Sequence, residues 1–116
     1  MARVDVAQPA SRHPTPFRKR MCLVSERTAE SVLTLAGDVD FASVVWWQRR
    51  IGEALRPLPT VLVLDLARVS FMDSSGVNLL IAARRMGLAQ DTRIRLRNKP
   101  AQVERLLSIS GMDRVF

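Results

Sequence analysis

The segment Phe71–Gly76, which reads Phe-Met-Asp-Ser-Ser-Gly, carries an aspartate and two serines at the junction of two different patterns. Before it, residues 61–66 form a short apolar run typical of a buried strand. After it, residues 77–88 have the spacing of an amphipathic helix. Open α/β folds place their sites at the carboxyl ends of strands, and a helix N-terminus favours negative charge. The serines and the aspartate could therefore serve in helix capping, catalysis or phosphate chemistry.

Catalysis is poorly supported by the rest of the chain. The sequence has one histidine, His13, and one cysteine, Cys22, so neither a hydrolase triad nor a Cys/His zinc site can be assembled within the fold. It also lacks a Gly-rich phosphate loop and a dinucleotide-binding fingerprint. We therefore predict that the protein is not an enzyme and holds neither a cofactor nor a metal.

Four aspartates are the remaining candidates for metal chemistry. Each ends a predicted strand or begins a predicted helix, so they could converge at one sheet edge and bind Mg²⁺: Asp38, Asp40, Asp65 and Asp73. Capping and turn formation explain the first three more simply, and we favour that interpretation.

Length and composition are those of one soluble domain. The chain has 116 residues, of which 47% are hydrophobic and 25% charged. No apolar run approaches the ~20 residues that span a bilayer, and no export signal is evident. A single cysteine suits a reducing compartment, so we expect a cytoplasmic protein without membrane insertion.

The positive charge is concentrated at the N-terminus. The whole chain carries +7. Residues 1–20 contribute +4 from five basic side chains against Asp5, which leaves +3 for residues 21–116. We predict a disordered basic tail over 1–20 and one domain over 21–116. The tail is either a solvated extension, which we favour, or an arm for an acidic partner or nucleic acid. Because the folded part is only mildly basic, nucleic acid is not an expected partner.

The patterns predict the element order β-β-α-β-α-β-α. Strands at 21–26 and 31–36 are joined by a hairpin turn at 27–30, and a loop follows at 37–40. A helix at 41–55 then begins with Asp40 as its N-cap. The later elements are a strand at 61–66, a helix at 75–88, a strand at 93–97 and a last helix with Pro100 in its first turn. The residues of this last helix predicted to face the core are Val103, Leu106, Leu107 and Ile109.

These elements predict a single α/β domain. Its mixed sheet would contain four or five strands, opened by the hairpin and continued by right-handed crossovers. The helices would pack mainly on one face.

Adjacent tryptophans in the 41–55 helix must point in different directions. Trp47 fits the apolar stripe with Val44 and Ile51, so Trp46 should lie at the side or outside. It either packs against the helix flank or contributes to a partner surface.

Several of these motifs together resemble the STAS domain family and, within it, the bacterial anti-sigma factor antagonists. The resemblance runs from about Glu30 to Phe116. It consists of Gly-Asp-Val-Asp at 37–40, Val-Leu-Asp-Leu before the site, Phe71–Gly76, Pro100 and the ending Gly-Met-Asp-Arg-Val-Phe. The Gly-Asp-x-Asp element lies about 36 residues before Asp-Ser-Ser-Gly, which makes the combination fairly specific.

The resemblance implies that Ser75, immediately before the glycine, is phosphorylated by the partner anti-sigma factor, a serine kinase of the GHKL type. Asp73 matches the acidic residue of that site, and Ser74 the small residue between them. With the helix predicted at 75–88, either Asp73 or Ser74 is its N-cap. We favour a capping role for Ser74, whereas Asp73 could serve in capping or in function. The other predicted partner-binding residues are Gly76, Asp40, Trp46 and Asn78.

The implied function is regulation of transcription by partner switching. The unphosphorylated antagonist binds the anti-sigma factor and frees the sigma factor, and a phosphatase reverses the modification. The alternative is a STAS subunit of a lipid ABC-type transport complex or a stress-signalling scaffold, with Ser75 in a docking site. We expect a monomer or a weak dimer.

Overall fold

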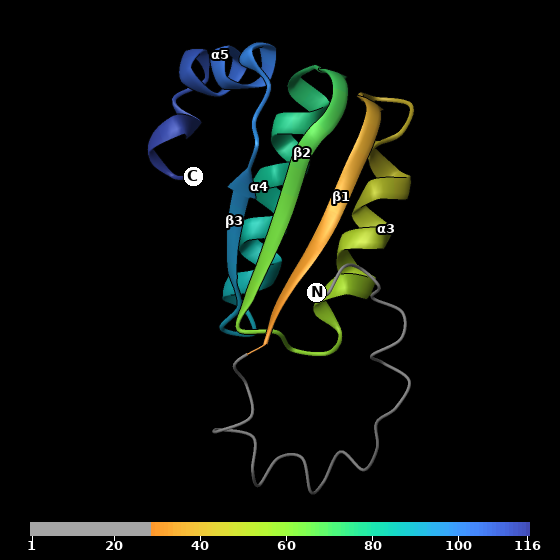
Figure 1. Cartoon of the computed structure of the whole chain (residues 1–116), viewed down its shortest axis with the longest axis vertical. Helices are drawn as coiled ribbons and strands as arrows, with labels where there is room; N and C mark the ends of the chain where they lie inside the picture. Colours follow the sequence, from red (N-terminus) through yellow and green to blue (C-terminus); the bar gives the residue numbers. More distant parts are fainter. Residues whose placement is uncertain (1–28) are drawn as a thin grey trace, which may run out of the picture.

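The computed structural model describes residues 29–116, in which strands and helices alternate along the chain (Figure 1). The predicted tail at 1–20 and the predicted strand at 21–26 lie outside these residues. The elements are β1 (Glu30–Val39), α3 (Val44–Leu55), β2 (Val61–Met72), α4 (Ser74–Leu88), β3 (Arg93–Arg97), α5 (Ala101–Ile109) and the short 3₁₀ helix η1 (Met112–Arg114).

The sheet has three strands over the described residues, in the order β1-β2-β3, and both pairings are parallel. The predicted sheet was mixed and had at least four strands. Its antiparallel member was the 21–26 strand, so that strand stays a prediction. The α/β class is confirmed, with a parallel sheet in the described part of the chain.

Strand β1 is longer than the sequence predicted. Residues 37–39, predicted as a loop, continue the strand and pair with the end of β2 as far as Val39↔Met72. The register shifts twice, between Thr34 and Ala36 and between Gly37 and Asp38. Gly37 has a φ of 80°, which suits glycine and marks the irregularity at the second shift. The glycine that suggested a loop therefore belongs to a bulged strand.

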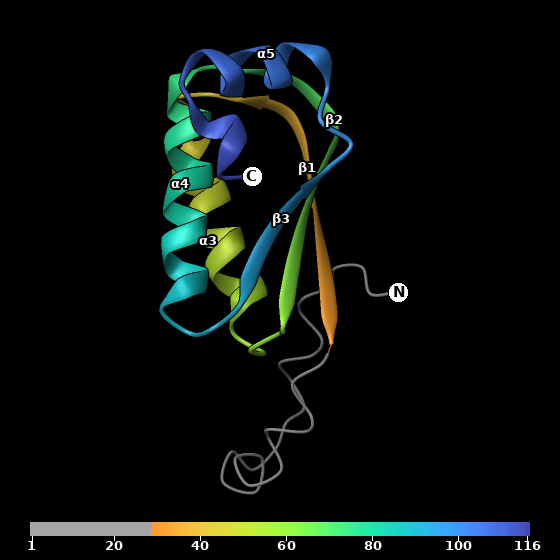
Figure 2. The ribbon, with the colours of Figure 1, turned by 90° about the vertical axis from the view of Figure 1, so that its left-hand side faces the viewer.

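One face of the sheet is covered by helices α3 and α4, while α5 crosses the carboxyl end of the strands (Figure 2). Buried side chains of α3 confirm the predicted stripe: Trp47, Ile51, Ala54 and Leu55. From α5, Val103 and Leu107 reach the core. Ile109 does not, since it is 77% exposed. Two residues beyond Leu107, it lies on the opposite side of the helix.

Strand β3 alternates as predicted. Ile94 and Leu96 are half-buried and pack against the core, whereas Arg93, Arg95 and Arg97 are exposed. Because successive residues of a strand point to opposite faces, the three arginines share the face of the sheet opposite α3 and α4.

Asp65 ties β2 to β3 and supports the first bulge. Its Oδ1 accepts hydrogen bonds from the Ala67 backbone N–H (3.0 Å) and Asn98 Nδ2 (3.2 Å), and its Oδ2 accepts one from Arg97 Nη2 (3.1 Å). Burial raises the pKa of Asp65, but the bonds from Ala67, Asn98 and Arg97 and the charge of Arg97 outweigh it. The pKa of Asp65 is therefore lowered.

No helix in residues 29–116 combines the length and the apolar character needed to cross a bilayer.

We predict that Asp65→Asn destabilises the domain at neutral pH by about 1 kcal/mol, because charge-assisted hydrogen bonds are lost. A carboxyl whose pKa is lowered by folding stabilises the protein above its unfolded pKa, and this contribution disappears as pH falls through the folded pKa. Urea unfolding from pH 7 down to pH 3 should show the two proteins converging below about pH 4. Glu53→Gln, in an exposed ion pair, is the control. A difference that does not vary with pH would contradict this role.

Candidate functional site

The Asp73 side chain caps helix α4. Its backbone is extended, with φ −116° and ψ −167°, and Oδ1 accepts from the N–H of Ser75 (2.8 Å) and of Gly76 (3.4 Å). These contacts satisfy two of the amides that a helix start leaves without partners. The helix begins at Ser74, one residue earlier than predicted. The capping role favoured for Ser74 is wrong, because Asp73 performs it.

The two hydroxyls differ in their surroundings. Ser74 is exposed, and Ser75 is half-buried in the first turn. Within the described residues the Ser75 hydroxyl makes no hydrogen bond, although its side chain is not sealed from solvent. Residues 29–116 therefore do not use this hydroxyl in a hydrogen bond that holds the fold together.

Gly76 lets the helix start close to the strand ends. A Cβ at this position would overlap the Met72 side chain and lie 2.9 Å from the Val39 carbonyl oxygen. That same oxygen accepts a 3.4 Å hydrogen bond from the Asp73 N–H. Gly76 is buried, so its place in the site is to allow this packing rather than to offer a side chain.

Asp40 organises the neighbouring loop. Its Oδ1 accepts from the N–H of Ala42 (3.0 Å) and of Ser43 (3.1 Å). Helix α3 starts at Val44 rather than at Phe41, with Ser43 at the N-cap position. Asp40 thus caps the turn that leads into the helix, and the N-cap assignment from the sequence is displaced by three residues.

The aspartates do not form a metal site. Asp65 is engaged with β3, Asp73 and Asp40 cap their own segments, and Asp38 is exposed. Over residues 29–116 no three side chains of the metal-binding types come close enough to hold an ion.

Helices α3 and α4 begin at the same end of the sheet (Figure 1). Several residues of their first turns and of the loop before α3 are exposed. Trp46 is 53% exposed and stands edge-on to Trp47 with ring centroids 4.6 Å apart, which confirms its predicted outward position. The Arg50 guanidinium lies 5.4 Å from the centroid of the Trp46 ring. Phe41 is 81% exposed, and Asn78 is exposed on the first turns of α4.

Arg84 and Arg85, the basic residues of α4, lie far from Ser75. They follow Ser75 by nine and ten residues, which is about 14 Å along a helix axis. Arg84 instead lines a groove beside β3.

Gln102 is a positioning residue that sequence patterns did not reveal. Its Oε1 accepts from the Met72 N–H (3.0 Å), and its Nε2 donates to the Met72 carbonyl (2.8 Å). Strand β3 pairs with β2 only up to Asp65, so this amide takes the place of a neighbouring strand next to Asp73. A glutamine on an amphipathic helix carries no signal of such a contact before the fold is known.

The chain was compared with known proteins. Residues 22–116 match the family described as "Mlab, STAS domain". Anti-sigma-F factor antagonist RsfB of Mycobacterium tuberculosis is 28% identical over 93 residues, which cover 80% of this chain and 75% of the relative.

Solved structures agree. The anti-sigma factor antagonist SpoIIAA in its unphosphorylated form superposes with a TM-score of 0.64 at 30% identity, covering 74% of this chain and 76% of that one. An antagonist from Mycobacterium paratuberculosis gives 0.65 at 25% identity, covering 76% and 74%. Fold and family match together define the class: the chain belongs to the STAS domain family. Its named relatives in these comparisons include several anti-sigma factor antagonists.

We predict that Gln102→Ala destabilises the domain by about 1–3 kcal/mol, because it leaves the Met72 N–H and carbonyl without partners. Urea unfolding measures the loss, and amide hydrogen exchange should show faster exchange at Met72. Gln48→Ala, on the exposed side of α3, is the matched control. Unchanged exchange at Met72 would contradict the role of Gln102.

Proposed function

We propose that this chain is a cytoplasmic anti-sigma factor antagonist whose binding is switched off by phosphorylation of Ser75. The observation that carries the proposal is a half-buried serine hydroxyl that makes no hydrogen bond within the described residues, in the first turn of α4 of a STAS domain. The antagonist relatives support the type of partner. The partner is a GHKL-type serine kinase that also binds a sigma factor, and a phosphatase restores the free hydroxyl.

In the modification, the Ser75 Oγ would form a bond to the γ-phosphorus of ATP held by the kinase. ADP would leave, and the hydroxyl proton would pass to a base of the kinase. The antagonist supplies an accessible acceptor and no catalytic group, which is why we regard it as a substrate and not as an enzyme.

Asp73 prevents a phosphate on Ser75 from binding to the backbone amides of the helix start. Its carboxylate already occupies the N–H groups of Ser75 and Gly76, so the phosphate cannot use them without displacing the cap. Helix α4 offers no basic side chain before Arg84, about 14 Å away, which exceeds the Debye length of ~8 Å at physiological salt. The new charge therefore has no counter-charge on its own helix.

The fold should tolerate this charge. The helix dipole favours it by about 0.3–1 kcal/mol. Repulsion from Asp73 at roughly 6 Å in water costs about 1.4 kcal/mol. These effects nearly cancel, whereas the same charge in a desolvated interface costs several kcal/mol. The switch therefore acts on the complex.

The partner surface would combine Ser74, Ser75 and Asn78 with Asp40, Asp73 and the exposed face of Trp46. Large aromatic side chains are the usual anchors of interfaces. Phosphorylation would place its charge among these contacts.

The alternative is a subunit of a lipid ABC-type transport complex or a stress-signalling scaffold, which membership of the STAS domain family leaves open. The named antagonist relatives favour regulation. Stable co-purification with an ABC ATPase that is indifferent to Ser75→Ala would favour the alternative.

We predict that a GHKL-type anti-sigma kinase with ATP labels the wild-type chain stoichiometrically and does not label Ser75→Ala. Ser75→Ala should fold normally, because the hydroxyl makes no hydrogen bond in the described residues. Ser74→Ala is the matched control and should be labelled like the wild type. Mass spectrometry locates the phosphate, and labelling at Ser74 would refute the assignment.

We further predict that Ser75→Asp changes Tm by less than about 4 °C, because the opposing electrostatic effects nearly cancel. Ser74→Asp provides a matched charge on the neighbouring exposed residue. Calorimetry measures Tm for both. Collapse of the fold in Ser75→Asp alone would show that the modification acts on stability instead of on binding.

A further inference from the structure

Strand β3 lies at one edge of the sheet formed by residues 29–116. The strand order β1-β2-β3 gives β3 one neighbour, and no other strand in residues 29–116 pairs with its second edge. Such an edge presents backbone N–H and C=O groups that can pair with another extended segment.

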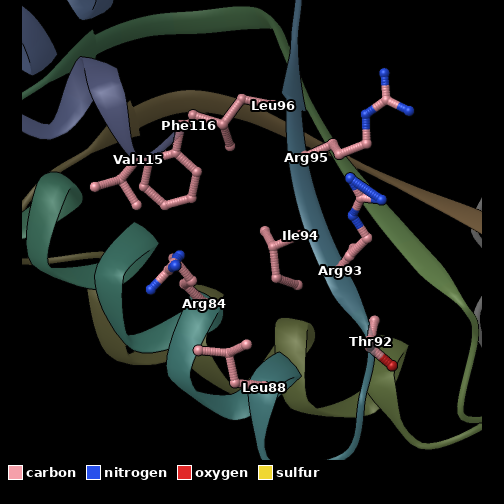
Figure 3. Close-up of a pocket in the computed structure, with 9 residues that line it drawn as sticks. All are labelled: Arg84, Leu88, Thr92, Arg93, Ile94, Arg95, Leu96, Val115 and Phe116. Carbon is pink, nitrogen blue, oxygen red and sulfur yellow. The ribbon is translucent and has the colours of Figure 1, made fainter.

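A groove of about 400 Å³ runs along this edge on the helix side (Figure 3). Its apolar lining comes from α4, β3 and the last residues of the chain: Leu88, Ile94, Leu96, Val115 and Phe116. Arg84 of α4 also lines the groove and adds a positive charge to it (Figure 3). Leu88 is 59% exposed and Val115 is 40% exposed, so the groove is accessible. Apolar side chains of an added strand would have a place to lie here.

The opposite face of the same edge is basic. Figure 3 shows Arg93 and Arg95 pointing away from the groove, while Ile94 points toward it. Neither arginine pairs with a carboxylate in the described residues, whereas Arg97 is held by Asp65 at 3.1 Å. Alternate residues of a strand are about 6.6 Å apart, so the Cα atoms of Arg93 and Arg95 match the spacing of alternate residues on a neighbouring strand.

We propose that the β3 edge binds an extended segment of a partner protein in which acidic and apolar residues alternate. The segment would extend the sheet by one strand. Its apolar side chains would enter the groove beside Ile94 and Leu96, and its carboxylates would face Arg93 and Arg95. Directly opposed side chains on neighbouring strands lie about 4.5–5.5 Å apart, which permits ion pairs.

The positive charge of β3 favours an acidic partner segment over a second copy of the chain. An antiparallel pair of β3 strands would bring arginine rows together, and like charges facing one another are destabilising. The same arginines discourage neutral or basic strands from pairing with the edge. A nucleic acid would use the arginines but neither the backbone edge nor the apolar side chains of the groove.

The groove is separate from the phosphorylation site. Leu88 follows Ser75 by 13 residues on α4, a distance of about 20 Å along the axis. A partner on β3 could therefore bind whatever the state of Ser75, and the proposal does not depend on the proposed function.

The probe is an end-capped peptide with the sequence Glu-Val-Glu-Ile-Glu-Val, with a scrambled Glu-Glu-Glu-Val-Ile-Val peptide as control. Titration followed by amide NMR shifts should locate binding at β3. We expect Arg93→Glu/Arg95→Glu to weaken binding by about tenfold, since each ion pair contributes on the order of half of that free energy. The matched control Arg49→Glu/Arg105→Glu makes the same charge change at exposed helix positions and should bind like the wild type.

Leu88→Glu provides a second variant, because it blocks the groove with an exposed residue and spares the core; it should also weaken binding. Equal binding of the scrambled peptide would overturn the proposal, as would binding that is unaffected by both changes. Tighter binding of a single-stranded oligonucleotide through Arg93 and Arg95 would overturn it in favour of nucleic acid. A concentration-dependent dimer that is lost in Leu88→Glu would overturn it in favour of self-association.

Discussion

The site depends on the close approach of the first turn of α4 to the ends of β1 and β2. Gly76 makes this approach possible, because any side chain there would meet Met72 and the Val39 carbonyl. The Asp73 N–H bonds to the same carbonyl, and the Asp73 carboxylate then closes the helix start. The Val39 carbonyl oxygen of β1 thus contacts both the cap residue and the buried glycine of the first turn of α4. The Ser75 hydroxyl projects from this support without contributing to it.

In the function proposed for this chain, the residues that hold the structure differ from the residue that is modified. The cap and the glycine hold the structure, so the hydroxyl can change its chemistry at little cost to folding. Asp73 has a second effect, since it occupies the amides that would otherwise neutralise a phosphate. Gln102 of α5 forms two hydrogen bonds with the backbone of Met72 and so supports the residue that precedes the cap. In the proposed function, a negative charge added at Ser75 therefore affects the partner that binds this end of the sheet more than it affects the fold.

Local patterns predicted much of this arrangement from the sequence. Alternation identified β3, helical spacing identified α3 and α4, and the placement of Trp47 inside and Trp46 outside followed from the helical period. Other features depend on contacts that are distant in sequence. Residues 37–39 join β1 only because β2 lies beside them, and Gln102 acts only where β3 ends. The N-cap could not be assigned between Asp73 and Ser74 because a shift of one residue in the start of the helix changes the answer, and periodicity does not locate a helix end that closely.

The central claim concerns binding and not folding, and one affinity measurement tests it most directly. The chain carrying phosphoserine at position 75 and the unmodified chain should be titrated into the anti-sigma factor of the same organism by calorimetry, with amide NMR spectra recorded for both. We predict that phosphorylation weakens binding by about 100-fold or more, while amides outside the first turns of α4 keep their shifts. Equal affinities, or a loss of affinity accompanied by general unfolding of the phosphorylated chain, would contradict it.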